Sequence, residues 1–238
     1  MAEPSGERGY RHGLTSSLPL SVAVFGFGVS YGVLALSVGM GSLAPVVMSA
    51  TTFAGSAQFA AASVLGAGGS ATTAILAALM LNARYLPLGV TVAPWLEGGF
   101  WSRLLHAHLM VDESWAIASE GRGRWNPRVL LGAGAGIWIA WLAGTIVGVA
   151  FGDALGDPSK LGLDAAFPAL FLALLAPQLR SEERATALAG LRIGAPPQAV
   201  AAVLGSAIAL VLTPFTPAGV PIICAGAACL IGLGRREA

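Results

Sequence analysis

Polar residues inside long apolar stretches are the features of this sequence most able to do chemistry, and Arg84 is the most informative of them. It stands in the run Leu81-Asn-Ala-Arg-Tyr85, near the end of an apolar window. Insertion scales put an arginine at the centre of a span at about 2.5–3.5 kcal/mol, so Arg84 needs an acidic partner or an aqueous cavity. We predict that it holds a substrate carboxylate or pairs with a protonatable acid. The alternatives are a structural ion pair and a later end to the span.

A second cluster, Phe53-Ala-Gly-Ser-Ala-Gln-Phe59, interrupts the preceding apolar window. Gly55 and Ser56 favour a break in the helix, because both residue types have lower helix propensity than alanine or leucine. A break would free backbone N–H groups, and the amino terminus of the following half-helix would attract a carboxylate. The alternative is an unbroken helix in which Gln58 bonds to a neighbour.

Three acids are candidates for proton coupling. Asp112 and Glu113 begin the run Asp112-Glu-Ser-Trp115, and they would reach Arg84 if their segment folds back into the protein. Asp164 lies near the start of a later apolar window. For Asp112 and Glu113 the alternative is that they are solvated, and for Asp164 it is a place at the membrane interface.

The first apolar window carries Gly28 and Gly32, whose spacing places them on one helix face where another helix can approach closely. Ser30 and Tyr31 add hydroxyl groups to the same stretch. The pattern Gly-x-Ser-x-Gly is also typical of hydrolase nucleophiles, but those need a strand, a turn and a helix that a membrane helix cannot supply. Helix packing is therefore the preferred interpretation of these glycines.

The composition predicts a bilayer as the solvent. Of 238 residues, 55% are hydrophobic and 11% are charged, against roughly 25% charged in a soluble domain. Too little polar surface remains to coat a soluble globule. The net charge of +1 gives no indication of a nucleic-acid partner. Cys224 and Cys229 match neither a metal site nor a disulfide framework, so we expect no metal and no cofactor.

Seven apolar windows come close to the length needed to cross about 30 Å of hydrocarbon. They are 18–38, 43–66, 71–92, 129–151, 161–179, 197–213 and 218–233. We therefore predict an all-α integral membrane protein of about seven transmembrane helices. The charged segment 95–127 predicts an amphipathic connector, interfacial or re-entrant, with an eighth span as the alternative.

The predicted organisation has tails at 1–17 and 234–238 around one transmembrane domain, 18–233. Its parts are a first repeat (18–94), the connector (95–127), a second repeat (128–213) and a last helix (218–233). The repeats are suggested by Gly28 and Gly32, because two glycines with the same spacing, Gly144 and Gly148, recur about 115 positions later. Three helices in each unit would make a 3+3 inverted repeat, a plan common among secondary transporters.

The distribution of basic residues predicts the orientation, since they favour the cytoplasmic side. With seven spans, Arg8, Arg11 and Lys160 lie on one side, and nine arginines from Arg103 to Arg236 lie on the other. This places the C-terminus in the cytoplasm and the N-terminus outside. An eighth span would move the N-terminus inside and leave the C-terminus where it is.

In their order and spacing, these clusters resemble the AzlC-type branched-chain amino acid permease family, the large subunit of a two-component exporter. The resemblance runs from about Leu18 to Gln178. It implies export of leucine, isoleucine, valine and sometimes methionine across the bacterial cytoplasmic membrane, driven by an ion gradient. It also implies a small AzlD-like membrane subunit as a partner. The matching segments are Pro19-Leu-Ser21, Phe27-Gly-Val-Ser-Tyr-Gly32, Met48-Ser49, Phe53-Ala-Gly-Ser-Ala-Gln-Phe59, Leu81-Asn-Ala-Arg-Tyr85 and Asp112-Glu-Ser-Trp115.

We accordingly expect a proton-coupled transporter that works by alternating access, and not an enzyme. Arg84, or N–H groups freed near Gly55, would hold the substrate carboxylate. Its amine would meet Gln58, Asn82 or a backbone carbonyl, and its aliphatic chain would lie near aromatic side chains. The predicted binding residues are Arg84, Gln58, Asn82, Ser56, Gly55, Tyr31, Tyr85, Phe53 and Phe59.

Two other classes of protein stay open on the sequence alone. An intramembrane enzyme could use His106, His108 and an acid, and it would show metal dependence or a reactive serine. A channel or structural subunit would leave the transport path to its partner.

Overall fold

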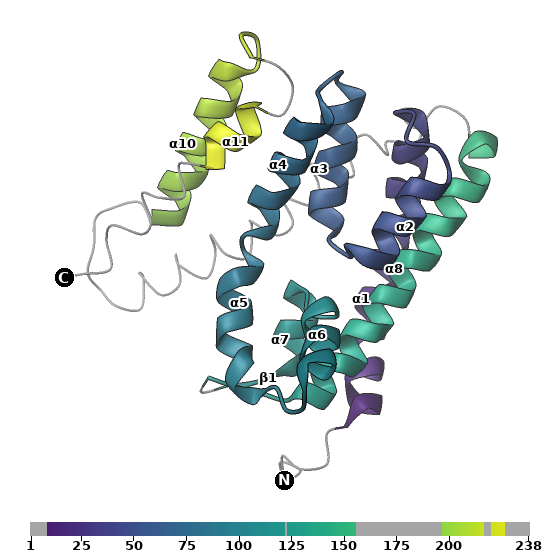
Figure 1. Cartoon of the computed structure of the whole chain (residues 1–238), viewed down its shortest axis with the longest axis vertical. Helices are drawn as coiled ribbons and strands as arrows, with labels where there is room; N and C mark the ends of the chain where they lie inside the picture. The colour runs from purple at the N-terminus through teal and green to yellow at the C-terminus, as the bar shows by residue number, and fades with distance from the viewer. Residues whose placement is uncertain (1–8, 122, 156–196, 217–219, 227–238) are drawn as a thin grey trace.

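The computed structural model of the protein describes residues 9–121, 123–155, 197–216 and 220–226 (Figure 1). Apart from one short ribbon of two antiparallel strands, β1 (Ser119–Gly121) and β2 (Arg124–Trp125), the elements of these residues are helical. The predicted all-α membrane fold is confirmed. The helices are α1 (Tyr10–Ser37), α2 (Leu43–Thr51), α3 (Gly55–Gly66), α4 (Ala71–Asn82), α5 (Tyr85–Val92), the 3-10 turn η1 (Ala93–Trp95), α6 (Phe100–His108), α7 (Asp112–Ala118), α8 (Pro127–Leu155), α10 (Pro197–Leu212) and α11 (Val220–Gly226).

Three helical stretches of the described residues are long and apolar enough to cross a membrane: Tyr10–Ser37, Ala71–Trp95 and Pro127–Gly152. The first of them begins eight residues before the predicted window at Leu18, so the predicted N-terminal tail is partly helical. The predicted span 161–179 and most of 218–233 lie outside the described residues. Asp164 also lies outside the described residues, and its role in proton coupling stays a prediction.

Helices α1 and α8 pack along each other through glycines. A Cβ atom added at Gly28 would lie 2.6 Å from the Trp141 carbonyl oxygen, and one added at Gly144 would lie 2.2 Å from that of Phe25. Real side chains cannot approach a neighbouring backbone so closely, so only glycine allows this separation. At the start of the pair, Gly13 meets Val129 in the same way. Because contacts advance together along both sequences, the two helices run parallel.

Helices α2 and α3 form a hairpin, the first hairpin (43–66), which enters from the upper end of Figure 1 and stops half-way. At about 1.5 Å per residue, helices of 9 and 12 residues span only half or so of the hydrocarbon. The end of α3 returns to the end of α1, where Gly66 lies against Val38. The tip lies beside the middle of α8, where the Trp138 indole N–H donates to the Ala50 carbonyl at 3.1 Å. The window 43–66 is therefore a broken, re-entrant segment and not a single span.

Helices α6 and α7 form the second hairpin (100–118), which enters from the opposite, lower end. Its base joins the start of α8, because the Asn126 N–H donates to the Ala118 carbonyl at 3.0 Å. Its tip reaches into the protein, where Leu109 lies against Gly134 and the His108 ring lies 6.2 Å from that of Trp138. The re-entrant alternative for the connector is the one the structure shows.

A long helix followed by a half-length hairpin thus occurs twice, in residues 10–66 and again in 71–118. The long helices α1 and α4–α5 run in opposite directions, and the two hairpins enter from opposite ends (Figure 1). The two units are inverted relative to each other. Their bounds, 10–66 and 71–118, differ from those of the 3+3 repeat that the glycines predicted, 18–94 and 128–213. That repeat would make α1 and α8 antiparallel, whereas they run parallel. The similar glycine spacing in α1 and α8 reflects the direct contact of these two helices with each other.

The first hairpin also decides where the N-terminus lies. Because residues 43–66 return to the end from which they enter, the start of α1 and the connector lie at the same, lower end, where Tyr10 contacts Gly132. The seven-span count placed Arg11 opposite Arg103, and the structure places them together. Hydropathy counted the hairpin as one crossing because its 24 residues have the length of a span.

Candidate functional site

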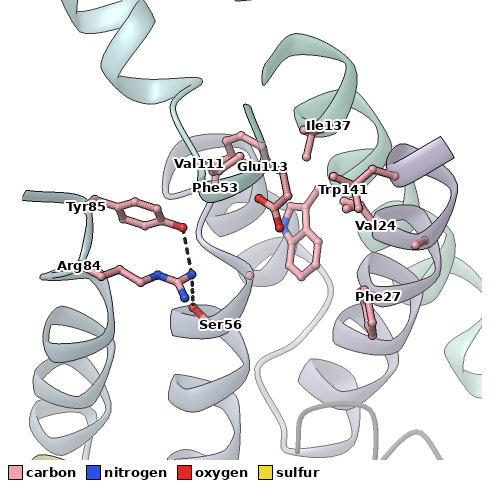
Figure 2. A pocket seen from close by; sticks show the side chains of 13 residues that line it. Val24, Phe27, Phe53, Ser56, Arg84, Tyr85, Val111, Glu113, Ile137 and Trp141 are labelled. Atoms are coloured by element: carbon pink, nitrogen blue, oxygen red, sulfur yellow. Dashed lines mark hydrogen bonds between the residues drawn. The ribbon is translucent and has the colours of Figure 1, made fainter. Parts of the chain in front are cut away.

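A cavity of about 270 Å³, the central cavity, lies where the tips of the two hairpins meet the break between α4 and α5 (Figure 2). Its volume falls just below the roughly 300–1,000 Å³ typical of small-ligand pockets. Arg84 and Tyr85 form one side, and Val24, Ile137 and Trp141 lie opposite them (Figure 2). The lining is mostly apolar with a few polar groups, as in sites for small amphiphilic molecules. The lining residues are Leu20, Ala23, Val24, Phe27, Phe53, Gly55, Ser56, Arg84, Tyr85, Val111, Glu113, Ile137 and Trp141.

Arg84 connects the two hairpins. Its Nη2 donates to Ser56 Oγ on the first hairpin at 3.1 Å and lies 2.9 Å from Asp112 Oδ2 on the second. The same nitrogen reaches the Tyr85 hydroxyl at 3.3 Å, and the guanidinium carbon lies 5.1 Å from the centre of the Tyr85 ring. The predicted pairing of Arg84 with an acid of the connector is therefore present.

The Arg84 guanidinium keeps one donor free for a ligand. Its Nε atom is buried and has no hydrogen-bond partner among the described residues. A buried donor without a partner costs roughly 1–3 kcal/mol, and a bound acceptor would remove that cost. Gly55 and Ser56 start α3 beside it, so the free N–H groups and positive end of that helix also face the cavity. These groups together are complementary to a carboxylate.

Glu113 is the acid of the cavity that has no ion pair in the described part of the chain. It follows Asp112 directly at the start of α7 and lines the same cavity as Arg84. Its carboxyl is therefore available to a cation or a proton that enters the cavity.

The tip of the first hairpin is held by Gln58, which is fully buried. Its Oε1 accepts from the Ala54 N–H at 3.3 Å, a backbone group that the break leaves free, and from the Trp141 indole N–H at 3.1 Å. Its Nε2 donates to Ser49 Oγ at 3.0 Å. Phe53, next to the break, adopts the left-handed conformation with φ at +43°. A non-glycine residue held there costs on the order of 1–3 kcal/mol, so this network maintains a strained turn.

Gln58→Leu should therefore destabilise the protein. The substitution keeps the volume but leaves the Ala54 and Trp141 N–H groups buried without acceptors, at roughly 1–3 kcal/mol for each. We expect a clear fall in the midpoint of thermal unfolding, followed by tryptophan fluorescence in detergent. Gln58→Glu, which can still accept from both groups, should lose less. A Gln58→Leu protein as stable as the wild type would show that the network is dispensable.

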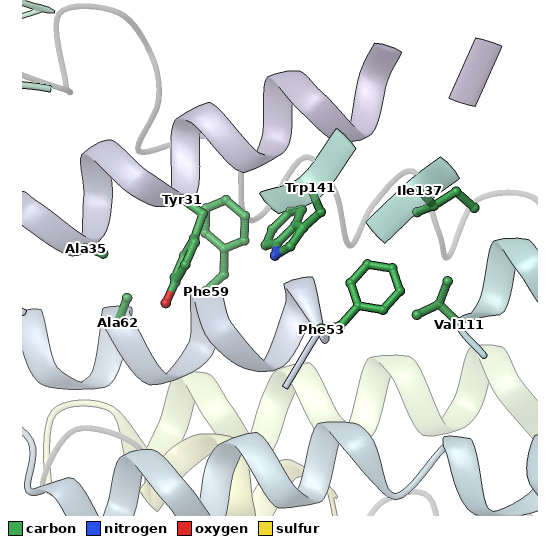
Figure 3. Close-up of a cluster of buried hydrophobic side chains, with 8 residues drawn as sticks. All are labelled: Tyr31, Ala35, Phe53, Phe59, Ala62, Val111, Ile137 and Trp141. Carbon is green, nitrogen blue, oxygen red and sulfur yellow. The ribbon is translucent and has the colours of Figure 1, made fainter. Parts of the chain in front are cut away.

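The structure brings five of the nine predicted binding residues to the cavity: Arg84, Tyr85, Ser56, Gly55 and Phe53. It places the other four, Gln58, Tyr31, Phe59 and Asn82, outside the lining. Tyr31 and Phe59 are fully buried behind the Trp141 ring, 5.7 and 6.2 Å from its centre (Figure 3). Asn82 ends α4, and its buried Oδ1 has no partner among the described residues.

The sequence analysis missed the apolar wall of the cavity. Leu20, Val24 and Phe27 lie three or four residues apart on α1, and Ile137 and Trp141 lie four apart on α8. That spacing gives each set one helix face. Since α1 and α8 are apolar on nearly every face, no sequence pattern marks the face that lines a cavity rather than touching lipid.

The matches to known proteins cover the elements that build this site. The model of the family described as AzlC protein matches residues 19–155, from α1 to the end of α8. This chain belongs to the AzlC family. It is 30% identical to the branched-chain amino acid transport protein AzlC of Bacillus subtilis over 188 residues, which cover 74% of this chain and 72% of the relative.

Two further relatives of this AzlC-family chain are uncharacterized membrane proteins. One, from Archaeoglobus fulgidus, is 31% identical over 76% of this chain and 81% of its own length. The other, from Haemophilus influenzae, is 28% identical over 74% of each chain. No solved structure gives a significant match. The membership agrees with the resemblance seen in the four sequence clusters.

Proposed function

We propose that this protein exports branched-chain amino acids, with the central cavity as the substrate site. The observation that carries the proposal is that Arg84, whose Nε donor has no partner among the described residues, lines a mostly apolar cavity of about 270 Å³. The relative from Bacillus subtilis is named as a branched-chain amino acid transport protein. Leucine, isoleucine and valine combine a carboxylate with a short apolar side chain, and the cavity offers a surface for each.

The substrate carboxylate would bind Arg84 together with the N–H groups at the start of α3. Its side chain would lie against Val24, Phe27 and Trp141, the apolar side of the cavity. Its ammonium would meet Glu113, whose carboxyl also lines the cavity. This assignment moves the amine from Gln58 and Asn82, the positions predicted from sequence, to an acid that faces the same space.

Coupling to protons would follow from competition for Glu113. In the structure Asp112 pairs with Arg84 at 2.9 Å, whereas Glu113 has no ion pair among the described residues. The substrate ammonium and a proton cannot occupy the Glu113 carboxylate together, so the arrival of one would release the other. Substrate and proton would thus exchange at one carboxylate, as coupled export requires.

Alternating access would use the two hairpins as gates. Each supplies one of the polar partners of Arg84, Ser56 from the upper end and Asp112 from the lower end. A ligand that replaces one partner loosens one hairpin and leaves the other in place. The opposite directions of the hairpins give each end of the membrane its own gate.

The positive-inside rule places the lower end in the cytoplasm. Arg11, Arg103, Arg124 and Arg128 lie there, whereas the upper connections 38–42 and 67–70 contain no charged residue. The N-terminus is then cytoplasmic in this proposal. Arg235 and Arg236 keep the C-terminus on that side by the same rule. The membrane would be the bacterial cytoplasmic membrane, with a small AzlD-like subunit as partner.

The pH dependence of export tests the role of Glu113. Glu113 faces the central cavity and has no ion pair among the described residues, so its carboxyl can bind a proton there. We expect efflux to accelerate as external pH falls from 8 to 6, and Glu113→Gln to flatten this response by removing the titrating group. The control is Glu7→Gln, which precedes α1 in the sequence and should keep the wild-type profile. An unchanged profile in Glu113→Gln would exclude Glu113 as the coupling acid.

Direct binding tests the substrate assignment. Radiolabelled leucine should bind the purified protein, and unlabelled isoleucine, valine and methionine should displace it. Aspartate and lysine should not, because a charged side chain would enter the apolar side without a partner. Equal displacement by all amino acids would contradict the assignment.

A further inference from the structure

A second cavity, the lower cavity, lies at the lower end of the protein and has a volume of about 580 Å³. Its walls come from the start of α1, η1, α6, the β-ribbon and the start of α8. It shares no lining residue with the central cavity and takes no part in the proposed transport mechanism.

Charges of both signs line the lower cavity. Arg124 and Arg128 are present together with Glu97 and Glu120, and none of the four forms an ion pair in the part of the chain that the structure describes. The Arg124 guanidinium carbon lies 5.7 Å from the centre of the Trp95 ring, which keeps it at the cavity. Unpaired charges of both signs around one space are complementary to a ligand that carries both.

The lower cavity also has a buried donor without an acceptor. The Trp125 indole N–H is shielded from solvent and makes no hydrogen bond within the described residues. Buried polar groups in native proteins nearly always have a partner. An oxygen-rich group bound in the cavity would supply one, next to the two arginines.

Helix α6 lies between the lower cavity and an exposed apolar surface. Ser102 and His106, four residues apart, face the cavity. The other face carries Phe100, Trp101 and Leu105, with exposed fractions of 71, 78 and 51%. Exposed aromatic residues at the end of a membrane-spanning bundle are typical of the headgroup level of a bilayer. A ligand in the cavity can therefore extend apolar chains along α6.

We propose that the lower cavity binds the headgroup of a zwitterionic phospholipid of the phosphatidylethanolamine type. Arg124, Arg128 and the Trp125 N–H bind the phosphate, and Glu97 and Glu120 bind the ammonium. The acyl chains lie against the exposed face of α6. Glu120 accepts a hydrogen bond from the Asn126 amide at 3.2 Å but has no cation beside it among the described residues. An anionic headgroup without an ammonium would bring neither glutamate a cation, and inorganic phosphate would also lack the chains.

Lipid binding to the purified protein tests this proposal without reference to transport. We expect native mass spectrometry in detergent to show one retained dioleoyl phosphatidylethanolamine, bound about tenfold more tightly than dioleoyl phosphatidylglycerol. Arg124→Gln should weaken this binding by about tenfold, which corresponds to roughly 1.4 kcal/mol. Trp125→Phe, which removes only the N–H donor, should weaken it by a smaller factor. Arg103→Gln is the matched control, because this exposed arginine of α6 does not line the cavity.

Three results would overturn the proposal. One is equal retention of phosphatidylethanolamine by the wild type, Arg124→Gln and Trp125→Phe. Another is preference for phosphatidylglycerol, which would make the site a general basic patch. The third is displacement of the lipid by millimolar inorganic phosphate, which would show that the phosphate alone is recognised.

Discussion

Replacing Arg84 with alanine should reduce branched-chain amino acid export to background while the protein still inserts and folds in the membrane. The guanidinium is the cation of the central cavity, and its loss leaves the substrate carboxylate without a partner. Removing one member of a hydrogen-bonded charge pair costs roughly 2–5 kcal/mol. The lower end of that range applies because the Arg84 side chain is 34% exposed. About 2 kcal/mol corresponds to roughly 30-fold weaker binding of leucine, measurable with radiolabelled ligand.

Two further variants sharpen this prediction. Arg84→Lys keeps the charge but loses the planar fork and the Nε donor, so binding should fall with the protein still stable. Arg103→Ala removes an exposed arginine outside both cavities and should bind and export as the wild type does. Normal export by well-expressed Arg84→Ala protein would show that Arg84 is structural.

Gly144→Ala should strongly destabilise the protein. Its Cβ would lie 2.2 Å from the Phe25 carbonyl oxygen and 3.1 Å from the Gly28 Cα, so α1 and α8 would have to separate. Overpacking a close contact typically costs 1–3 kcal/mol, and this one involves backbone that cannot rotate away. We expect a lower midpoint of thermal unfolding and loss of monodisperse protein in gel filtration.

Gly26→Ala is the matched control for this prediction. Gly26 lies on α1 between Phe25 and Gly28, but a Cβ atom there would meet nothing within 4 Å. Because alanine favours helix more than glycine does, this variant should be as stable as the wild type or slightly more so. Similar stability of Gly144→Ala and Gly26→Ala would contradict the close packing of α1 on α8.

The sequence indicated the centre of the site because a charged side chain there follows an apolar segment, where an unpaired charge is costly. Arg84 follows a run of apolar residues and must find a partner, and Asp112 was a named candidate for that partner. Gly55 and Ser56 marked the break for a similar local reason, their poor fit to a helix interior. Signals of this kind depend on a few neighbouring residues, so one sequence is enough to read them.

Contacts between distant segments had no such signal. Gln58 and Trp141 are 83 residues apart, and nothing local shows that the amide accepts from the indole rather than from a substrate. Tyr31 and Phe59 were predicted in the cavity because they lie beside its motifs, but the Trp141 ring separates them from it. The sequence also could not show whether residues 43–66 cross the membrane or turn back, since a hairpin and a span of 24 residues have the same hydropathy.

The most direct test of the central claim is efflux of preloaded radiolabelled leucine, isoleucine and valine from cells that express this protein, with and without its small membrane partner. We expect efflux several-fold faster than in cells that express Arg84→Ala at the same level. A further gain with the partner would show that the export unit has two components. Efflux equal to that of Arg84→Ala in every combination, with both proteins verified in the membrane, would contradict the assignment of the central cavity to branched-chain amino acids.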